Sequence, residues 1–582
     1  MQPSGTGTRR GKVNPWGWLS GYRAAWLPHD IVAGVTLAAY AIPVSLAYAA
    51  LAGLPPQVGI YGYLLGGIGY ALLGSSRQLA VGPTSAISLM IAGSVGAMAD
   101  GDMQRYAQIA SLAAFTVAVL SVLSWLLRLS VIALLISDSI LVGFKIGAGL
   151  TIGLTQLPGL IGVPGGGHNF LERLSVLAGQ LGEAQLPVLA IGFAAIVLLL
   201  LGERWFPGRP VALGVVVLAI LIASLLGLSA KGVPVTGEIP SGLPNLSLPE
   251  LRLRDVEGIF PLAAGCLLLA YVEGVSAGRT FAAKHGYPLD MRQEFLGIGA
   301  ANLATALGHG YPVAGGLSQS AVNDKAGARS PLALIFASIT LALCLLFLTG
   351  LLANLPKAVL SAIVLTAILG LFDFRALAHM WRVSRIDFYA ATIALVAVLL
   401  LGILQGILLA AFACVALLLM RVSRPHVAFL GRIPGSRAYS DMERHPDNDA
   451  LRNVIAVRPE ASLIYVNAAA VLDTIRTRLA RHDLSDLRML ICDLSASPFI
   501  DLAGSRMLHE LYAELAQHGI AMRIVGAHSY VRDFLRADGI GDKVGGLDRA
   551  VTIHDLIGSA ESEGLSTRPD GRRNTAAGPE RS

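Results

Sequence analysis

Long apolar segments recur along the first 421 residues of the chain, separated by short polar, glycine- or proline-containing stretches. Most of them hold about 15–25 residues, the length of a helix that crosses ~30 Å of hydrocarbon at ~1.5 Å per residue. Two are too short to cross the bilayer, at residues 84–99 and 318–328. The pattern predicts fourteen membrane segments, at residues 30–50, 57–74, 84–99, 105–127, 130–160, 187–203, 210–228, 259–282, 291–308, 318–328, 331–353, 356–372, 385–401 and 403–421.

The pattern changes after residue 421. Residues 423–450 are rich in Arg, Pro, Asp and Gly, which predicts a linker, and residues 559–582 are so poor in bulky apolar side chains that we expect a disordered tail. Between them, over residues 451–558, β-like runs (463–466, 488–495, 522–527) alternate with amphipathic helices (469–482, 504–519, 530–539). This alternation predicts a small α/β domain, which follows a cytoplasmic N-terminal segment (1–28) and a membrane domain (29–422).

Composition agrees with a membrane protein, because 54% of the residues are hydrophobic and only 14% are charged. The net charge of +6 does not indicate nucleic-acid binding, since the basic residues lie mainly in loops beside the apolar segments. If both termini are cytoplasmic, most of these loop residues fall inside, as the positive-inside rule requires. No cleavable signal peptide precedes the first segment, so we expect a multi-pass protein of the plasma (inner) membrane.

Residues that carry enzyme chemistry are sparse. Cys266, Cys344, Cys414 and Cys492 are spaced too widely for a metal knuckle or a disulfide framework, and we expect them to be buried. His168, His309 and His379 stand alone in loops or near segment ends. The chain has no P-loop, HExxH motif or nucleophile elbow, so we predict neither an enzyme nor a cofactor.

An internal repeat relates the two halves of the membrane domain. Residues 40–45 (YAIPVS) match residues 271–276 (YVEGVS), 231 positions later, and residues 81–86 (VGPTSA) match residues 314–319 (AGGLSQ) at nearly the same offset. With seven segments in each repeat, at about 30–228 and 259–421, the second repeat enters the membrane from the opposite side. This is the inverted-repeat arrangement of secondary transporters.

The two short segments each follow a helix-breaking pair, Gly82-Pro83 and Gly315-Gly316. Extended backbone inside a membrane is tolerated only where it faces protein or a watered cavity. We therefore expect two half-length helices whose N-termini, each with a partial positive charge, point at one central anion site, with Ser85 and Ser318 adding hydroxyl donors. The alternative is that the glycines only allow close helix packing and the serines bond back to their own helices.

Three of the ionisable residues inside predicted segments are Glu273, Lys145 and Asp138. Glu273 is a candidate to carry a coupling ion, because an intramembrane carboxylate is a functional-site hypothesis by default; the alternative is a structural ion pair with Lys145 or Arg279. For Lys145 we expect the side chain to extend toward a membrane face, and for Asp138 a position near the end of its segment.

Several motifs together resemble the SulP sulfate permease family, which includes plant sulfate transporters and animal anion exchangers. They are AGVTLAAYAIPVSLAYAALAGLPPQVGIYG (33–62), VGPTSAIS (81–88), GGLSQSAVNDKAGARSPLA (315–333), LPKAVLSAIV (355–364) and CDLSASPFIDLAGSRML (492–508). The resemblance covers about residues 15–557 and implies a polytopic α-helical fold of 7+7 segments, with a uracil-permease-like core and gate. The last motif resembles a STAS domain.

The resemblance also implies site residues and partners. The substrate site would comprise Tyr40, Thr84, Ser85, Ala86, Gly316, Leu317, Ser318 and Gln319, and the coupling ion (H⁺ or Na⁺) would bind near Glu273 and Ser276. Many animal and plant members carry arginine where this chain has Gln319, so a cation at Glu273 is a more attractive way to balance the substrate charge. The resemblance implies a homodimer, and a cytoplasmic partner of the STAS domain is a further expectation.

One departure concerns the STAS motif, where related antagonist proteins phosphorylate a serine in an Asp-Ser-Ser-Gly turn. Here the turn is Asp501-Leu502-Ala503-Gly504, followed by Ser505. The acceptor hydroxyl is missing, so we expect a docking, folding or dimer-supporting role rather than a phosphorylation switch.

The sequence therefore predicts a secondary active transporter for a small inorganic or carboxylate anion, with elevator-like alternating access. Helix N-termini and hydroxyls accept many anions, so family frequency alone makes sulfate the first choice. The alternatives are a bicarbonate or C4-dicarboxylate transporter, an anion exchanger or channel of the same fold, and a membrane sensor that signals through its soluble domain.

Overall fold

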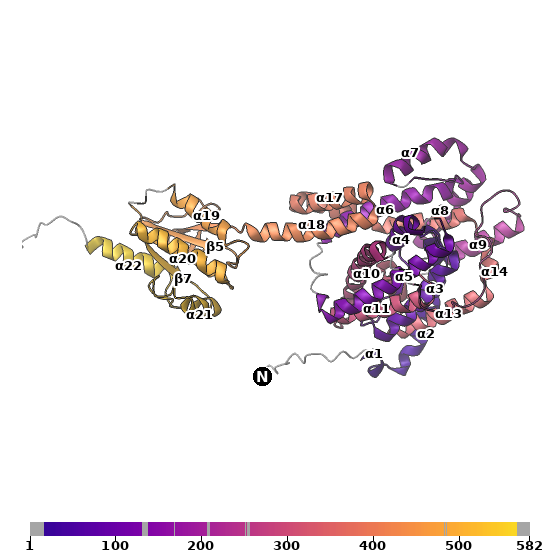
Figure 1. The fold of residues 1–582 in the computed structure, drawn as a ribbon, viewed down its shortest axis with the longest axis horizontal. Coiled ribbons are helices and arrows are strands. Elements are labelled where there is room, and N and C mark those ends of the chain that lie inside the picture. The colour runs from indigo at the N-terminus through magenta and orange to yellow at the C-terminus, as the bar shows by residue number, and fades with distance from the viewer. Residues whose placement is uncertain are drawn as a thin grey trace, which may run out of the picture. The chain divides into compact units, whose positions relative to one another are not determined.

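The computed structural model describes residues 17–99, 101–130, 138–167, 169–206, 210–250, 252, 256–481, 484 and 486–566. The chain divides into two compact units, Met1–Cys414 and Val415–Ser582. Each unit has its own buried apolar core. Figure 1 labels most helices of the first unit and, in the second, strands β5 and β7 and four helices.

Each of the fourteen predicted membrane segments contains a helix. The first repeat holds α2 (Leu27–Leu51), α3 (Pro56–Leu73), α4 (Ser85–Ala99), α5 (Met103–Leu126), α6 (Asp138–Ile161), α8 (Leu186–Trp205) and α9 (Val211–Leu225). The second holds α10 (Val256–His285), α11 (Met291–Leu307), α12 (Leu317–Lys325), α13 (Leu332–Phe347), α15 (Lys357–Ile368), α17 (Arg385–Leu401) and α18 (Ile403–Ser423). Among the described residues, seven helices are long and apolar enough to span a membrane by themselves.

The sequence pattern did not predict several short helices, most of which lie between these segments, while two lie at the ends of predicted segments. They are α1 (Gly17–Ser20), η1 (Ala24–Trp26), α7 (Phe170–Gln180), η3 (Leu181–Glu183), α14 (Thr349–Leu352), η5 (Leu369–Leu371) and α16 (Phe374–Val383). Most are too short, or too polar on one face, to register as an apolar run.

The packing of the helices follows the inverted repeat. Helix α3 packs against its counterpart α11, and α6 packs against its counterpart α15. Other contacts occur in symmetric pairs: α3 with α13 and α11 with α5, α2 with α13 and α10 with α5, α6 with α17 and α15 with α8. We call α2–α5 with α10–α13 the core bundle, and α6–α9 with α15–α18 the gate bundle.

The predicted chain breaks before the two short helices are present. Strands β1 (Val81–Gly82) and β2 (Ala314–Gly315) pair antiparallel, and α4 and α12 begin directly after them. Asn302 fixes the approach to β2, because its side-chain amide donates to the Val313 carbonyl (3.1 Å) and accepts from the Val313 N–H (3.0 Å). Helix α4 has 15 residues and α12 has 9, so at ~1.5 Å per residue neither crosses the hydrocarbon.

The second unit contains a five-stranded sheet in the order β4-β3-β5-β6-β7. Its strands are β3 (Val427–Arg432), β4 (Tyr439–Asp441), β5 (Val454–Pro459), β6 (Met489–Asp493) and β7 (Ala521–Val525), and its helices are α19 (Ala468–Leu479), α20 (Leu502–Gln517), α21 (Ser529–Ala537) and α22 (Ile553–Ser566). Side chains alternate across each strand, so Leu490 and Cys492 pack with α19 and α20, while Ile491 packs with α22 on the other face.

Three predictions for this unit were wrong. The predicted linker at 423–450 supplies β3 and β4, which the sheet needs as its antiparallel edge. Residues 463–466, predicted as a strand, do not form one, and Tyr465 among them is 77% exposed. The strand at this place in the chain is β5, which is buried on both faces. Helix α22 continues to Ser566, into the predicted disordered tail, because Ile553 and Ile557 anchor it on the sheet; residues 567–582 lie outside the described residues.

Candidate substrate-binding site

A cavity of about 570 Å³ lies between the core and gate bundles. Its core side is formed by α2, α10 and the starts of α4 and α12, and its gate side by α6, α8, α9 and α15. Ala86 is buried behind the wall and does not line the cavity. The other nine predicted site residues do line it: Tyr40, Thr84, Ser85, Glu273, Ser276, Gly316, Leu317, Ser318 and Gln319.

The first half-helix presents unpaired donors to this cavity. The Thr84 carbonyl accepts the Ser88 N–H (2.9 Å), so the N–H groups of Ser85, Ala86 and Ile87 precede the first intrahelical hydrogen bond. The Thr84 hydroxyl is buried and has no hydrogen-bond partner among the described residues. An unsatisfied buried hydroxyl in a cavity wall indicates a ligand that would satisfy it.

The second half-helix begins in the same way. Gly316 caps α12 in an extended conformation (φ −102°, ψ 142°), makes no side-chain cap, and accepts the Ser320 N–H (3.1 Å) through its carbonyl. Leu317 and Ser318 are exposed to the cavity. Because β1 and β2 lie side by side and antiparallel, the positive ends of both half-helices start from the same place.

Gln319 is part of the wall rather than a free donor. Its side chain is 4% exposed, its Oε1 accepts a hydrogen bond from the Tyr63 hydroxyl, and its Nε2 donates to the Ala314 carbonyl (3.0 Å). The amide therefore ties α3 and β2 to the start of α12. Sequence reasoning missed Tyr63, because no pattern along the chain links two residues 256 positions apart.

The cavity holds four charged side chains, Lys145, Glu203, Glu273 and Lys325. The expectation that Lys145 extends to a membrane face was wrong: it lines the cavity, since the face of α6 that carries it is turned toward the core bundle. Asp138 starts α6, as predicted, but its side chain lies outside the described part of the structure.

Glu273 has no hydrogen bond, and no ion pair within 4.0 Å, among the described residues. Arg279, one predicted partner, donates to Met291 Sδ (2.5 Å) instead. Lys145, the other predicted partner, lines the same cavity. Ser276 lies three residues further along α10, on the same face of the helix.

One tyrosine that sequence reasoning missed, Tyr48, completes the part of the wall that α2 forms. Tyr48 lines the cavity with Tyr40 and Val44. The three α2 residues are spaced four apart, so they share one helix face. That spacing could have identified Tyr48 from the sequence once Tyr40 was chosen.

Comparisons with known proteins agree with this geometry. The family model described as "Sulfate permease family" matches residues 27–396, and the STAS domain model matches residues 445–557. This chain belongs to the sulfate permease family. The family consists of transporters, so the prediction that the protein is not an enzyme is confirmed.

Two relatives of this permease are similar over most of its length. A probable sulfate transporter of Mycobacterium tuberculosis is 33% identical over 535 residues, 91% of this chain and 95% of that protein. The chloroplastic sulfate transporter 4.1 of Arabidopsis thaliana is 30% identical over 559 residues, 93% of this chain and 81% of that protein.

The fold of the permease matches solved structures. The murine anion transporter Solute Carrier 26 family member A9, in its inward-facing state, superposes with a TM-score of 0.87 at 20% identity and covers 96% of this chain and 97% of its own. The transmembrane domain of a cyanobacterial bicarbonate transporter gives 0.59 at 21% identity and covers 68% and 98%. The predicted fold, a polytopic helical membrane protein with a C-terminal STAS domain, is confirmed.

Outside the cavity, the remaining candidate residues have structural roles. All four cysteines are free and buried, as predicted, and burial raises the pKa of the Cys492 thiol to about 12, so it is not a nucleophile at neutral pH.

Asp501 caps α20 by accepting the Gly504 N–H (2.9 Å). Ser505 is fully buried and donates to Asp538, which gives a kinase no access to its hydroxyl in the folded domain. His309 bonds Ser247 (2.8 Å), and His168 lies outside the described residues.

Proposed function

We propose that this permease is a secondary active transporter that takes up sulfate together with a proton or sodium ion, the core bundle moving against the gate bundle. The observation that carries the proposal is the cavity between the two bundles, into which both half-helices present their N-termini. The unpartnered Thr84 hydroxyl and the exposed Ser318 supply further donors.

Sulfate as the substrate is supported by the relatives, which are named as sulfate transporters in Mycobacterium tuberculosis and Arabidopsis thaliana. The site offers backbone N–H groups and hydroxyls at the place where the substrate would lie. Such donors suit an oxyanion with several acceptor oxygens.

The strength of the site fits a carrier. One helix N-terminus stabilises an anion by about 0.3–1 kcal/mol when exposed and up to about 2 kcal/mol when partly buried. Removing an anion from water costs several kcal/mol even after relaxation. Two helix ends with hydroxyls therefore offset that cost without a large surplus, and a loosely held substrate leaves quickly.

Coupling to a cation follows from the charges in the cavity. Two lysines and two glutamates line it, so a sulfate dianion adds two negative charges to a set that is neutral before it arrives. A proton or sodium ion bound at Glu273, with Ser276 beside it, would reduce that excess. Gln319 adds no charge, and its amide is already committed to Tyr63 and Ala314.

The test is labelled sulfate uptake into proteoliposomes that contain the purified protein. Ser318→Asp places a negative charge at the start of α12, and we expect uptake to fall at least about 100-fold, as a like charge in a desolvated site costs several kcal/mol. Ser318→Asn has nearly the same size and no charge, and should stay within about tenfold of the unmodified protein. Equal uptake by the two variants would remove the start of α12 from the substrate site.

The same vesicles identify the substrate and the coupling ion. Unlabelled sulfate, bicarbonate and fumarate are compared as competitors, and sulfate should compete best. Under an imposed pH gradient the unmodified protein should concentrate sulfate, while Glu273→Gln should only equilibrate it. If both respond equally to the pH gradient and to a sodium gradient, Glu273 has no role in coupling.

A further inference from the structure

Lys145 and Glu273 stand on opposite sides of the boundary between the two bundles. Lys145 is on gate helix α6, about 10 Å from its start at ~1.5 Å per residue, and Glu273 is on core helix α10. Both line the cavity. In an alternating-access cycle these two helices belong to bodies that move past each other.

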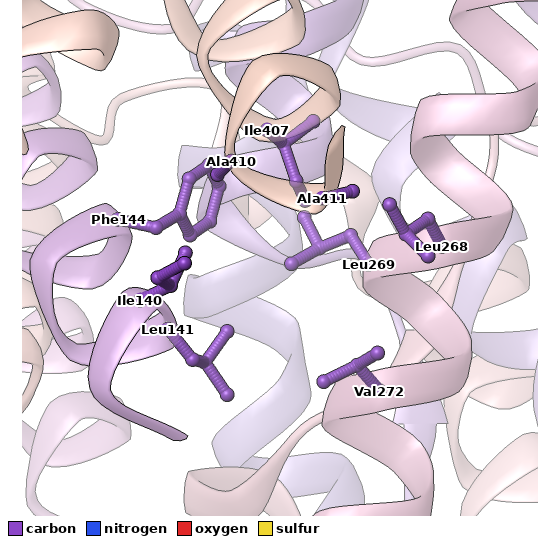
Figure 2. A pocket seen from close by; sticks show the side chains of 9 residues that line it. All are labelled: Ile140, Leu141, Phe144, Leu268, Leu269, Val272, Ile407, Ala410 and Ala411. Atoms are coloured by element: carbon purple, nitrogen blue, oxygen red, sulfur yellow. The ribbon is translucent and has the colours of Figure 1, made fainter. Parts of the chain in front are cut away.

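An apolar slot lies between the two helices that carry this pair, with α18 as its third wall. Figure 2 shows its lining, which includes Leu141 and Phe144 from α6, Leu269 and Val272 from α10, and Ile407 and Ala410 from α18. Leu141 is four residues from Lys145, and Leu269 is four residues from Glu273. Residues four apart share a helix face, so the faces that meet across the slot are the faces that carry the two charges. The described residues that line the slot are all apolar.

Other charged groups around Glu273 are engaged elsewhere. On α11, Arg292 lies over Trp125 and Glu294 accepts from Tyr70 and Ser75. On α12, Asp324 bonds Lys284 and His285. On α5, Arg105 bonds Gln108. Within the described part of the chain, the titratable groups that share the cavity with Glu273 are Tyr40 and Tyr48 from α2, Tyr63 from α3, Lys145 from α6, Glu203 from α8 and Lys325 from α12.

A lysine in the middle of a membrane helix is costly unless a partner or water compensates its charge, by about 2.5–3.5 kcal/mol on insertion scales. Glu273 is the acidic side chain that lines the cavity from the core bundle, opposite the helix that carries Lys145. Glu203, the other acid in the cavity, is on α8 of the same gate bundle as Lys145, so a pair between those two does not cross the boundary. The pairing across the boundary therefore depends on the relative position of the two bundles.

We propose that Lys145 is a positioning residue for ion release, whose charge favours the Glu273 carboxylate in the state seen here and is carried away from it when the core bundle moves. In the opposite state Glu273, away from the lysine, takes a proton from the solution that then fills the cavity. When the core returns, Lys145 favours loss of that proton to the solution on the releasing side. The carboxylate left behind repels the sulfate, so both passengers leave in the same state.

This inference rests on the proposed function, and two transport modes separate it from that function. Net uptake requires proton release in each cycle, whereas exchange of labelled for unlabelled sulfate can run with Glu273 protonated throughout. We expect Lys145→Gln in the full-length protein to reduce net pH-driven uptake at least about tenfold, which is within the usual range of coupling between two sites. The exchange of labelled for unlabelled sulfate should be retained. Lys145→Arg, which keeps the charge, should restore net uptake. Lys325→Gln, the matched change at the other cavity lysine, should leave the pH dependence of net uptake in place.

The pair itself is tested by combining variants. If Lys145 acts through Glu273, then Lys145→Gln added to Glu273→Gln should cause no further loss, whereas independent effects would add. Thermal unfolding of each purified variant shows whether it is folded, and sulfate-induced stabilisation against pH reports the same pair without transport. The inference is overturned if Lys145→Gln retains the pH dependence of net uptake, or loses exchange and net uptake equally while folded. If the unmodified protein moves no sulfate in either mode, it is the proposed function that fails.

Discussion

The two half-helices begin alike and are held in place differently. Helix α4 continues from Thr84 and Ser85 into apolar residues, and Ile87, Met90, Ile91 and Val95 are buried in the core. Helix α12 is polar along its length, and four of its nine residues, Gln319, Ser320, Asn323 and Asp324, are buried polar side chains. Apolar burial is non-directional, whereas hydrogen bonds fix position and angle. We infer that α12 sets the geometry of the site and that α4 adapts to it.

The polar contacts of α12 tie it to both repeats. Ser320 Oγ accepts the Ala80 N–H (2.9 Å), and Asn323 Nδ2 donates to the Gln78 carbonyl (3.0 Å), so α12 is bound to the chain that leads into β1. Asp324 bonds Lys284 Nζ (2.6 Å) and His285 Nε2 (2.5 Å) at the end of α10. On α4 the corresponding contact is between Ser88 and Tyr311 (3.0 Å).

The largest expected effect comes from the most buried of these charges. Asp324→Asn keeps the shape of the side chain but removes its charge, and Asp324 is only 3% exposed. We expect a loss of about 1–3 kcal/mol in the free energy of unfolding, below the value for a fully buried pair because Lys284 is largely exposed. Thermal unfolding of the purified protein measures it, with the exposed Glu183→Gln as the matched control. If Asp324→Asn has the same melting temperature as the control, the contacts of Asp324 with Lys284 and His285 do not hold α12 in place. The contrast with α4 then disappears.

A matched pair of serines gives the next effect. Ser88 and Ser320 are each the fourth residue of their half-helix, and both are fully buried. Ser320→Ala leaves the Ala80 N–H buried without an acceptor, which costs about 1–3 kcal/mol, whereas Ser88→Ala leaves a tyrosine hydroxyl that can rotate to another acceptor and should cost less, about 1 kcal/mol. The melting temperatures of the two purified variants are compared, and that of Ser320→Ala should fall further. A larger loss in Ser88→Ala would reverse the roles that we assign to the two half-helices.

The half-helices themselves could be predicted from the sequence. The reason is local: Gly82-Pro83 and Gly315-Gly316 both precede segments too short to span, at nearly the same offset in two repeats. Backbone breaks in a membrane have few permitted surroundings, so the sequence constrains the structure strongly there. The full set of ten site residues came from the resemblance to the family; nine of them line one cavity, while their roles in binding stay predictions.

What holds the half-helices could not be predicted, because it depends on distant residues. Asp30 accepts from the Arg329 N–H (2.7 Å) and from the Ser330 hydroxyl (2.7 Å), about three hundred positions along the chain. Lys145 shows a second limit, since hydropathy finds a helix but does not tell which of its faces meets the cavity. The strands at 427–432 and 439–441 show a third, because short edge strands among Gly, Arg and Pro look like a linker until their partner strand is known.

The smallest effect tests whether the half-helix held by apolar burial also supplies a ligand-binding donor. Thr84→Val keeps the shape of the side chain and removes a hydroxyl that is buried and unpartnered, so the free energy of unfolding should stay constant or rise by up to about 1 kcal/mol. Sulfate bound at the half-helices would lose one hydrogen bond, worth about 0.5–1.5 kcal/mol, so the KM for uptake should rise about two- to tenfold.

Stability and substrate affinity therefore change in opposite directions in Thr84→Val. Ser88→Ala cannot produce this combination, because Ser88 bonds Tyr311 and does not line the cavity. Thr392→Val on α17, whose hydroxyl bonds its own helix, controls for the loss of a hydroxyl in general. A Thr84→Val protein that unfolds more easily and transports with an unchanged KM would show that the hydroxyl serves the fold, and α4 would then be a structural counterpart to α12 rather than a second wall of the site.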